Sequence, residues 1–335
     1  MRKTALAALI LSTVITTVTT TPAWAKPSVV IGYENNGADP WMVSQAQHLF
    51  QKTMPANVQL KFFDSGPAAM SALASNSLQF MCGLGVPPFV AAISQGVPLG
   101  IIFNQERYTS AAGIVVRPGG GIKTIADLKG KKIAIVEGSQ SSFELATFLA
   151  EAHIPFSAVH QLNMSPPEMR VAWTTKSIDA AIVWDPVFDA LHSMGGKILK
   201  TDADLPPDAS SYNICIADTQ WAKTHPKLVT DFIRALDQGV TFTRTHPHQA
   251  LALMAKQAGI TIATAKTELA GYQIFSAKDQ TTPHVLGTPK TVATSATTKT
   301  IENTAKTLLK IGRIDKLPPH PANAVLPQYA ETAAH

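Results

Sequence analysis

The chain has 335 residues, of which 45% are hydrophobic, only 15% are charged and two are cysteines. Charged residues make up about 25% of an ordinary globular protein, so this composition excludes a disordered chain and a coiled coil. The length suits about two domains, and two cysteines are too few for a disulfide scaffold. The net charge of +5 comes from scattered residues, with no basic block, which argues against a nucleic-acid partner.

The N-terminus has the pattern of a secretory signal peptide. Arg2 and Lys3 precede an apolar run over 5–15, and small residues stand at Ala23 and Ala25. The run is too short to span a bilayer, and small side chains at these two positions suit signal peptidase. We therefore expect residues 1–25 to be removed and the rest of the chain to be exported. We expect no lipid anchor, because no cysteine lies near this cleavage site.

Strands and helices alternate in the first part of the exported chain. β-Branched and apolar runs predict strands at 29–33, 58–63, 78–82, 99–103 and 113–116. Apolar residues at helical spacing predict helices over 41–54, 68–74 and 89–95. This β-α-β alternation indicates a parallel sheet with helices on both faces.

A second βαβ set follows the glycine-rich loop at 117–121. Its predicted strands are 132–136, 159–162, 178–183 and 197–200, and its predicted helices are 143–152, 167–174 and 187–193. A strand at 212–217 and helices at 226–243, 248–258, 262–272 and 292–311 complete the pattern. We expect two α/β lobes, each a mainly parallel sheet flanked by helices and joined by a two-strand hinge: lobe I from 26–112 and 214–335, and lobe II from 113–213. Ligands of such sheets bind where loops leave the carboxyl ends of strands.

Several stretches resemble the periplasmic taurine-binding proteins of ABC importers, namely 63–66, 72–75, 91–98, 127–134 and 172–186. This resemblance implies a two-lobed periplasmic binding protein that closes over its solute. It implies capture of taurine or a related alkanesulfonate and delivery to an ABC permease in the inner membrane. It also implies a monomer without catalysis or cofactor. We expect no metal site, because His225, His246 and His248 lie beside prolines without carboxylate or cysteine at ligand spacing.

The candidate site for the sulfonate group lies at the start of the helix predicted over 143–152. Four polar residues precede that helix, namely Ser139, Gln140, Ser141 and Ser142. Their hydroxyls and the free N–H groups of the first turn suit sulfonate oxygens, although serines at this place also serve as ordinary N-caps. Glu144 competes for the same helix end unless its side chain turns outward.

A second loop near the ligand is Gly85-Val86-Pro87-Pro88, where taurine-binding relatives often carry Gly-Ser-Ser-Pro. The prolines bring no N–H, so Gly85 and Val86 are the expected donors. The loop resembles the Pro-Pro version of alkanesulfonate-binding relatives, and a purely structural role is the alternative. Asn36 and Ser65 are further expected ligand contacts.

The ammonium end of taurine requires a carboxylate. Asp185 is the first candidate and Asp39, with Trp41 nearby, is the second, although an aspartate before a proline also starts helices. Trp184 is expected either to stack on the ligand or to cover the core. Asn213 stands where the taurine-binding relatives often have an acidic residue, which weakens a zwitterion site and suits a plain anion.

Two alternatives remain open. One is a binding protein for another solute: nitrate, a larger or aromatic sulfonate, or a pyrimidine. The other is an enzyme that cleaves carbon–sulfur bonds in sulfinates with Cys82 as nucleophile, although the neighbours of Cys82 are apolar and offer no activating base. Cys82 and Cys215 both lie in apolar strand-like runs, where buried free thiols are common, and we expect free thiols rather than a disulfide.

Overall fold

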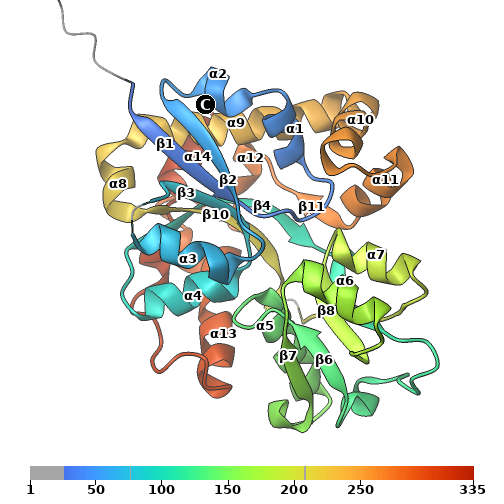
Figure 1. Ribbon diagram of the computed structural model, residues 1–335. Helices are drawn as coiled ribbons and strands as arrows, with labels where there is room; N and C mark the ends of the chain where they lie inside the picture. Colours follow the sequence, from blue (N-terminus) through green and yellow to red (C-terminus); the bar gives the residue numbers. More distant parts are fainter. Residues whose placement is uncertain (1–25, 76, 207–208) are drawn as a thin grey trace, which may run out of the picture.

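The computed structural model describes residues 26–75, 77–206 and 209–335, so the predicted signal peptide at 1–25 lies outside the described residues. The chain forms two sheets, each flanked by helices, in two lobes (Figure 1). Lobe I carries the sheet with the order β11-β4-β10-β3-β1-β2, and lobe II carries the sheet with the order β7-β6-β8-β5-β9. Within these residues, no helix combines the length and the apolar character that crossing a bilayer requires.

The sheet of lobe I combines parallel and antiparallel pairs. Its strands are β1 (Ser28–Tyr33), β2 (Asn57–Phe62), β3 (Phe80–Leu84), β4 (Leu99–Tyr108), β10 (Tyr212–Asp218) and β11 (Tyr272–Ile274). Strand β1 is parallel to β2 and β3, whereas β10 is antiparallel to β3 and β4, and β11 is antiparallel to β4. The parallel strands β1 and β3 therefore end at the same edge of the sheet.

The sheet of lobe II is also mixed. Its strands are β5 (Ala112–Val116), β6 (Lys132–Ile135), β7 (His160–Asn163), β8 (Ala180–Trp184) and β9 (Lys197–Thr201). Strand β6 is parallel to β7 and β8, and β5 is antiparallel to β8 and β9. The two-lobed α/β fold is as predicted. The sheets differ from the mainly parallel expectation because the strands on either side of the lobe crossings, β4–β5 and β9–β10, take part in antiparallel pairs.

Helices surround both sheets (Figure 1). Those of lobe I are α1 (Pro40–Ala46), α2 (Leu49–Thr53), α3 (Gly66–Ala74), α4 (Val86–Ser94), α8 (Thr219–Thr224), α9 (Pro226–Thr245), α10 (Pro247–Ala258), α11 (Ile262–Ala270), α12 (Ala277–Gln280), α13 (Ala296–Lys310) and α14 (Pro327–Ala333). Those of lobe II are α5 (Gln140–Glu151), α6 (Pro166–Thr174) and α7 (Val187–Ser193), with short 3-10 turns such as η3 (Asp202–Asp204) between elements. Helix α13 contacts both α4 and α5, and so touches both lobes.

Helices α4 and α5 begin earlier than predicted, at Val86 and Gln140, and three other predicted helices differ more. The helix predicted over 41–54 is broken into α1 and α2 at His48, whose backbone is left-handed with φ of 55°. The helix predicted over 262–272 ends at Ala270, and Tyr272 begins β11. The helix predicted over 292–311 starts as a 3-10 turn and becomes α13 only at Ala296. Helices α8, α12 and α14 were not predicted, because helices this short span too few turns to show a periodic pattern.

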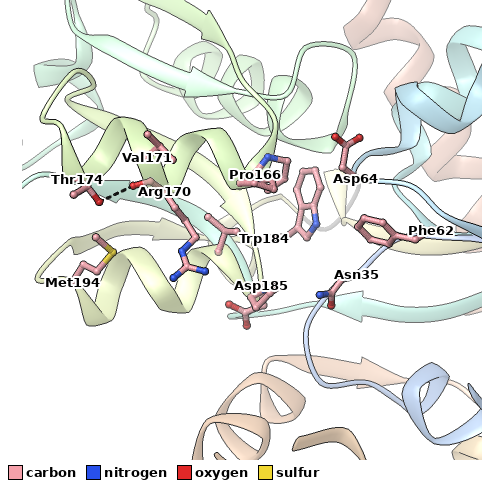
Figure 2. Close-up of a pocket in the computed structure, with 13 residues that line it drawn as sticks. Asn35, Phe62, Asp64, Pro166, Arg170, Val171, Thr174, Trp184, Asp185 and Met194 are labelled. Atoms are coloured by element: carbon pink, nitrogen blue, oxygen red, sulfur yellow. Dashed lines mark hydrogen bonds between the residues drawn. The ribbon is translucent and has the colours of Figure 1, made fainter. Parts of the chain in front are cut away.

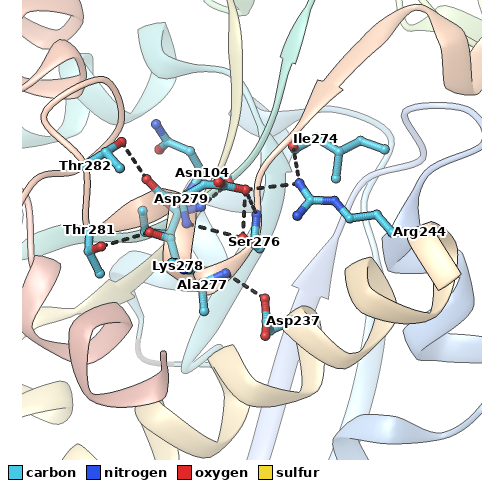
Figure 3. A network of polar contacts seen from close by, with 11 residues as sticks. Asn104, Asp237, Arg244, Ile274, Ser276, Ala277, Lys278, Asp279, Thr281 and Thr282 are labelled. Atoms are coloured by element: carbon cyan, nitrogen blue, oxygen red, sulfur yellow. Dashed lines mark hydrogen bonds and ion pairs between the residues drawn. The ribbon is translucent and has the colours of Figure 1, made fainter. Parts of the chain in front are cut away.

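A polar network holds α12 against α9 (Figure 3). Ser276 and Asp279 form a reciprocal capping box at the start of α12. Arg244 of α9 pairs with Asp279 at 3.0 Å, and Asp237 of α9 accepts a 2.6 Å hydrogen bond from the backbone N–H of Ala277. The ion pair is half exposed and contributes about 1 kcal/mol at most. Its main effect is to fix α12 and the preceding β11 at the edge of the sheet of lobe I.

Cys82 and Cys215 form a disulfide, so the expectation of free thiols is wrong. Cys82 lies on β3 and Cys215 on β10, and these strands are antiparallel neighbours in the sheet of lobe I. The pairing register shifts between Ile214 and Ile216, and the two Cα atoms lie 4.1 Å apart. The sequence gives no sign of this pairing, because the two cysteines are 133 residues apart and come together only through the sheet topology.

The disulfide closes a loop that contains all of lobe II, and we expect it to stabilise lobe I. Loop-closure entropy for a span of 133 residues corresponds to about 5 kcal/mol in the unfolded-chain model. Reduction should therefore lower the unfolding temperature by several degrees in calorimetry. The Cys82→Ala/Cys215→Ala variant should unfold at the lower temperature with or without reductant. An unfolding temperature in the wild type that does not respond to full reduction would contradict this expectation.

Candidate functional site

A narrow cleft lies between the two lobes and is called the inner cleft here. Lobe I contributes Glu34, Asn36, Gly66, Gly83, Gly85, Pro88, Tyr108 and Asn213; Ala112, Ser139, Gln140, Glu144, Trp184 and Ser211 complete the lining. Its volume is about 20 Å³, which is the room of about one water molecule. In this arrangement of the lobes, the cleft has no room for a larger solute.

The inner cleft lies at the edge where β1 and β3 end. Asn36 follows β1, and its Nδ2 donates a 2.8 Å hydrogen bond to the carbonyl oxygen of Gly83 on β3. Gly83 has φ of +82°, and a Cβ at this position would lie only 2.5 Å from Nδ2 of Asn36. A glycine is therefore required here, both by the backbone conformation and by the close approach of Asn36. This contact fixes the loop after β1 against β3.

Two helix N-termini meet across the inner cleft. Gly85 is the N-cap of α4 in lobe I, and Ser139 is the N-cap of α5 in lobe II. A Cβ added to Gly85 would lie 2.9 Å from Cβ of Gln140, so the two helix starts are in direct contact. Helix N-termini carry unpaired N–H groups and a partial positive charge, which favours an anion between them.

Helix α5 starts at Gln140 rather than at the predicted 143, so Ser139 is its N-cap and Ser141 and Ser142 lie in its first turn. These serines mainly hold the helix start against the end of β6. The Ser139 hydroxyl donates to the Val136 carbonyl oxygen at 2.8 Å, and the Ser141 hydroxyl accepts from the Val136 N–H at 3.0 Å. The Ser142 hydroxyl donates to the same carbonyl oxygen at 3.0 Å. Of the predicted four, Ser139 and Gln140 line the inner cleft, whereas Ser141 and Ser142 are buried behind it. The Nε2 of Gln140 is buried and makes no hydrogen bond within the described part of the chain.

Carboxyl groups line the other part of the inner cleft. Glu34 and Glu144 both face it, and Glu144 points inward rather than outward. Burial, together with the nearby Asp64 carboxylate, raises the pKa of Glu34 well above its ordinary value. Burial, together with the carboxylate of Asp202, raises the pKa of Glu144 likewise. No lysine or arginine is among the residues described as lining this cleft. Its electrostatics therefore come from carboxyl groups and helix ends.

Asn213 lies in the inner cleft with its amide engaged. Its Nδ2 donates to Oε1 of Glu106 at 2.6 Å and contacts the Tyr108 hydroxyl at 2.9 Å. Burial raises the pKa of Glu106 well above its ordinary value, as does the Asp39 carboxylate. Position 213 carries an amide and not the acidic residue often found in the taurine-binding relatives. The carboxyl group of Glu106 on β4 lies directly beside this amide.

Several predicted contacts lie outside the inner cleft, namely Asp39, Trp41, Ser65, Val86, Ser141, Ser142 and Asp185. Asp39 is the N-cap of α1 and accepts from the N–H of Met42 at 3.1 Å. Trp41 packs in the core of lobe I, with its ring 4.7 Å from that of Phe50. Ser65 and Val86 are buried neighbours of the cleft-lining glycines at 66 and 85.

Asp185 lies in a second and wider space, which we call the outer groove. This groove has a volume of about 510 Å³ and shares Trp184 with the inner cleft. Figure 2 shows Phe62 and Asp64 of lobe I on one side and Arg170 of α6 on the other, with Trp184 between them. Oδ1 of Asp185 accepts a 2.9 Å hydrogen bond from the N–H of Asp189, which is the role of a helix-start aspartate. The groove leads outward from the inner cleft past Trp184.

Three residues that line the inner cleft were not predicted as site residues, namely Glu34, Tyr108 and Ser211. Glu34 directly follows the predicted strand 29–33, so its place at a carboxyl end was a usable signal. Tyr108 and Ser211 lie at the two lobe crossings, where the chain shows no periodic pattern. Only the pairing of β4 with β10 brings them together.

The buried carboxyl groups should make the folded protein more stable in mild acid than at alkaline pH. Burial raises the pKa of Asp39 and of Asp202 from 3.8 to about 7. Between about pH 4 and pH 7 the folded protein holds these protons and the unfolded chain has lost them, so the unfolding free energy falls as pH rises. We expect a value at pH 5 that exceeds the value at pH 8 by on the order of a few kcal/mol, measured by urea unfolding.

A matched pair of variants identifies the source of this pH dependence. Asp202→Asn should make it shallower, because the amide does not titrate and Asp39 still does, whereas Asp315→Asn, in an exposed loop, should leave it unchanged. Equal or greater stability at pH 8 in the wild type would contradict the assignment of these protons.

Two curated relatives have names that describe sulfonate or taurine binding. The chain is 28% identical to the putative aliphatic sulfonates-binding protein of Escherichia coli K12 over 232 residues, which cover 69% of this chain and 71% of that protein. It is 32% identical to the taurine-binding periplasmic protein of the same organism over 213 residues, which cover 62% of this chain and 64% of that protein.

A solved structure shares the fold. The alkanesulfonate-binding protein SsuA from Xanthomonas axonopodis pv. citri, bound to MOPS, superimposes with a TM-score of 0.73 and 23% identity over 91% of this chain and 99% of that one. This likeness confirms the predicted two-lobed fold. Residues 57–250, more than half of the chain, match the family model described as NMT1/THI5 like. The chain therefore belongs to the NMT1/THI5-like family.

Proposed function

We propose that this protein is the solute-binding component of an ABC importer, which captures taurine or a related alkanesulfonate in the inner cleft. It works in the periplasm and delivers the solute to a permease in the inner membrane. Sulfonate- and taurine-binding relatives support this proposal. The proposed ligand contacts are the residues that line the inner cleft, with Trp184 at its outer side.

The observation that carries the proposal is the contact between the starts of α4 and α5 across the lobe boundary. A sulfonate presents three oxygens that share one negative charge. Placed between the two helix starts, it receives N–H groups from both lobes and needs no lysine or arginine. The Nε2 of Gln140, which is buried without a partner in the described structure, supplies one more donor at the same place. An anion bound there links the lobes to each other.

Binding involves a hinge motion of the two lobes. The inner cleft, at about 20 Å³, is too small for a sulfonate to enter while the lobes stay in contact. We propose that 26–112 and 214–335 move relative to 113–213 about the crossings at 113–117 and 210–213. An ion pair between Arg313, after α13, and Glu137, before α5, joins the lobes when they are closed.

Catalysis by Cys82 receives no support from the geometry. Its sulfur is bonded to Cys215, and its side chain is buried in the sheet of lobe I. A disulfide-bonded sulfur is not a thiolate nucleophile. The protein is therefore proposed to bind its solute without changing it.

A larger or aromatic sulfonate is the second candidate ligand. The outer groove offers about 510 Å³ lined by apolar side chains such as Phe62, Val171 and Met194, and it adjoins the inner cleft at Trp184. A ligand with its sulfonate between the helix starts has room for an apolar tail in this groove.

Sulfonate binding should stabilise the folded protein by mass action. Taurine, ethanesulfonate and a longer sulfonate such as MOPS, each at about 100 times its dissociation constant, should add about 2.7 kcal/mol to the unfolding free energy and raise the unfolding temperature. Nitrate and a pyrimidine serve as comparison ligands in the same thermal unfolding series. A shift with one of these and none with any sulfonate would overturn the proposal.

Gly85→Ala should weaken sulfonate binding at least about tenfold in titration calorimetry. The added methyl group meets Cβ of Gln140 across the cleft, so it blocks the contact between the helix starts and occupies the anion position. The backbone of Gly85, with φ of −71°, accepts alanine without strain. Gly120→Ala, in an exposed loop of lobe II, is the matched control and should bind normally. Unchanged affinity in Gly85→Ala would place the ligand elsewhere.

A further inference from the structure

We infer that Glu34 recognises a protonated amine on the ligand and so selects aminoalkanesulfonates over sulfonates that lack the amine. The inference deepens the proposed function and rests on it, because the same inner cleft holds the sulfonate. It assigns the amine to the carboxyl group after β1 rather than to Asp185 or to position 213.

The side chain of Glu34 points into the inner cleft without a partner for one oxygen. Its backbone N–H donates to the Cys82 carbonyl oxygen at 3.2 Å, which fixes the residue at the end of β1 beside β3. The residue is 7% exposed, and its Oε1 has no hydrogen-bond partner within the described residues. A buried carboxyl oxygen without a donor is costly, so it marks a place for a donor from the ligand.

Neighbouring side chains do not supply that donor, and the nearby backbone donor is the N–H of Gly66, which lowers the pKa of Glu34 against the effect of burial. The carboxylate of Asp64 lies near Glu34 and repels its charged form, and no lysine or arginine is among the lining residues described. Gly66, at the start of α3, lies beside Oε1: a Cβ built on this glycine would be 3.1 Å from that oxygen. The N-terminus of α3 favours the ionised carboxylate and so opposes the effect of burial. A ligand ammonium adds a charge-assisted hydrogen bond to that carboxylate.

The competing carboxyl groups are already engaged. Oε1 of Glu106 accepts from Asn213, and Oδ1 of Asp185 accepts from the N–H of Asp189. Glu144 lies against Asp202, and burial raises the pKa of both. The Asp202 carboxyl group raises the pKa of Glu144 further, whereas a hydrogen bond with Glu144 lowers the pKa of Asp202. Glu34 faces the cleft from lobe I, whereas α5 brings its helix start from lobe II. The cleft thus offers an anion position at the α4 and α5 starts and a cation position at Glu34.

Taurine and ethanesulfonate provide the test, because they share the sulfonate and the two-carbon chain and differ in the amine. Titration calorimetry on the wild type should show taurine binding at least about thirtyfold more tightly, since ethanesulfonate leaves the buried carboxyl group unpaired. In Glu34→Gln the preference should fall below about threefold while ethanesulfonate still binds. Glu34→Asp, which keeps the carboxyl group, should retain part of the preference.

Asp185→Asn is the matched control, because it removes the carboxylate next to Trp184 in the outer groove. This variant should keep the full preference for taurine. A preference that survives Glu34→Gln, or that disappears in Asp185→Asn, overturns the assignment. Equal binding of both ligands by the wild type also overturns the assignment. That result leaves the proposed sulfonate site intact, and it does not depend on the folding of any variant. Failure of the wild type to bind either sulfonate overturns the proposed function and this assignment with it.

Discussion

The contact between the starts of α4 and α5 is the interaction on which the rest of this molecule depends. Each lobe presents one helix N-terminus, and the two helix starts meet at Gly85 and Gln140. Two partial positive charges in contact repel each other, so an anion between them stabilises the closed arrangement. In the proposed site, solute binding and lobe closure are one event, because neither lobe alone forms the complete anion position.

The acidic part of the inner cleft places a second requirement on the ligand. Glu34 and Glu144 are buried there without a basic side chain in the described lining, so a simple anion gains nothing from them. Burial raises the pKa of both groups, and a ligand cation favours the ionised form of the carboxyl group that it meets. A molecule with a sulfonate at one end and an amine at the other satisfies both parts of the cleft. We propose that the neutral tail of a larger sulfonate would lie in the outer groove instead, beyond Trp184.

Local pattern was enough to predict most of the architecture. The alternation of β-branched runs with helical spacing predicted the two α/β lobes, and the serine-rich loop predicted the N-terminus of α5. Contacts that depend on strand pairing were not predictable in this way. The Cys82–Cys215 disulfide needs β3 beside β10, and the Asn213–Glu106 contact needs β10 beside β4. Asp39 and Asp185 are aspartates at helix starts, where the same residue type serves a cap or a ligand equally well.

A crystal structure of the protein grown with taurine tests the central claim most directly. The account predicts one taurine in the inner cleft, with sulfonate oxygens at the backbone N–H groups that begin α4 and α5. It also predicts the taurine nitrogen within hydrogen-bond distance of the Glu34 carboxylate. Taurine bound in the outer groove alone, or with its sulfonate turned away from both helix starts, would contradict the account.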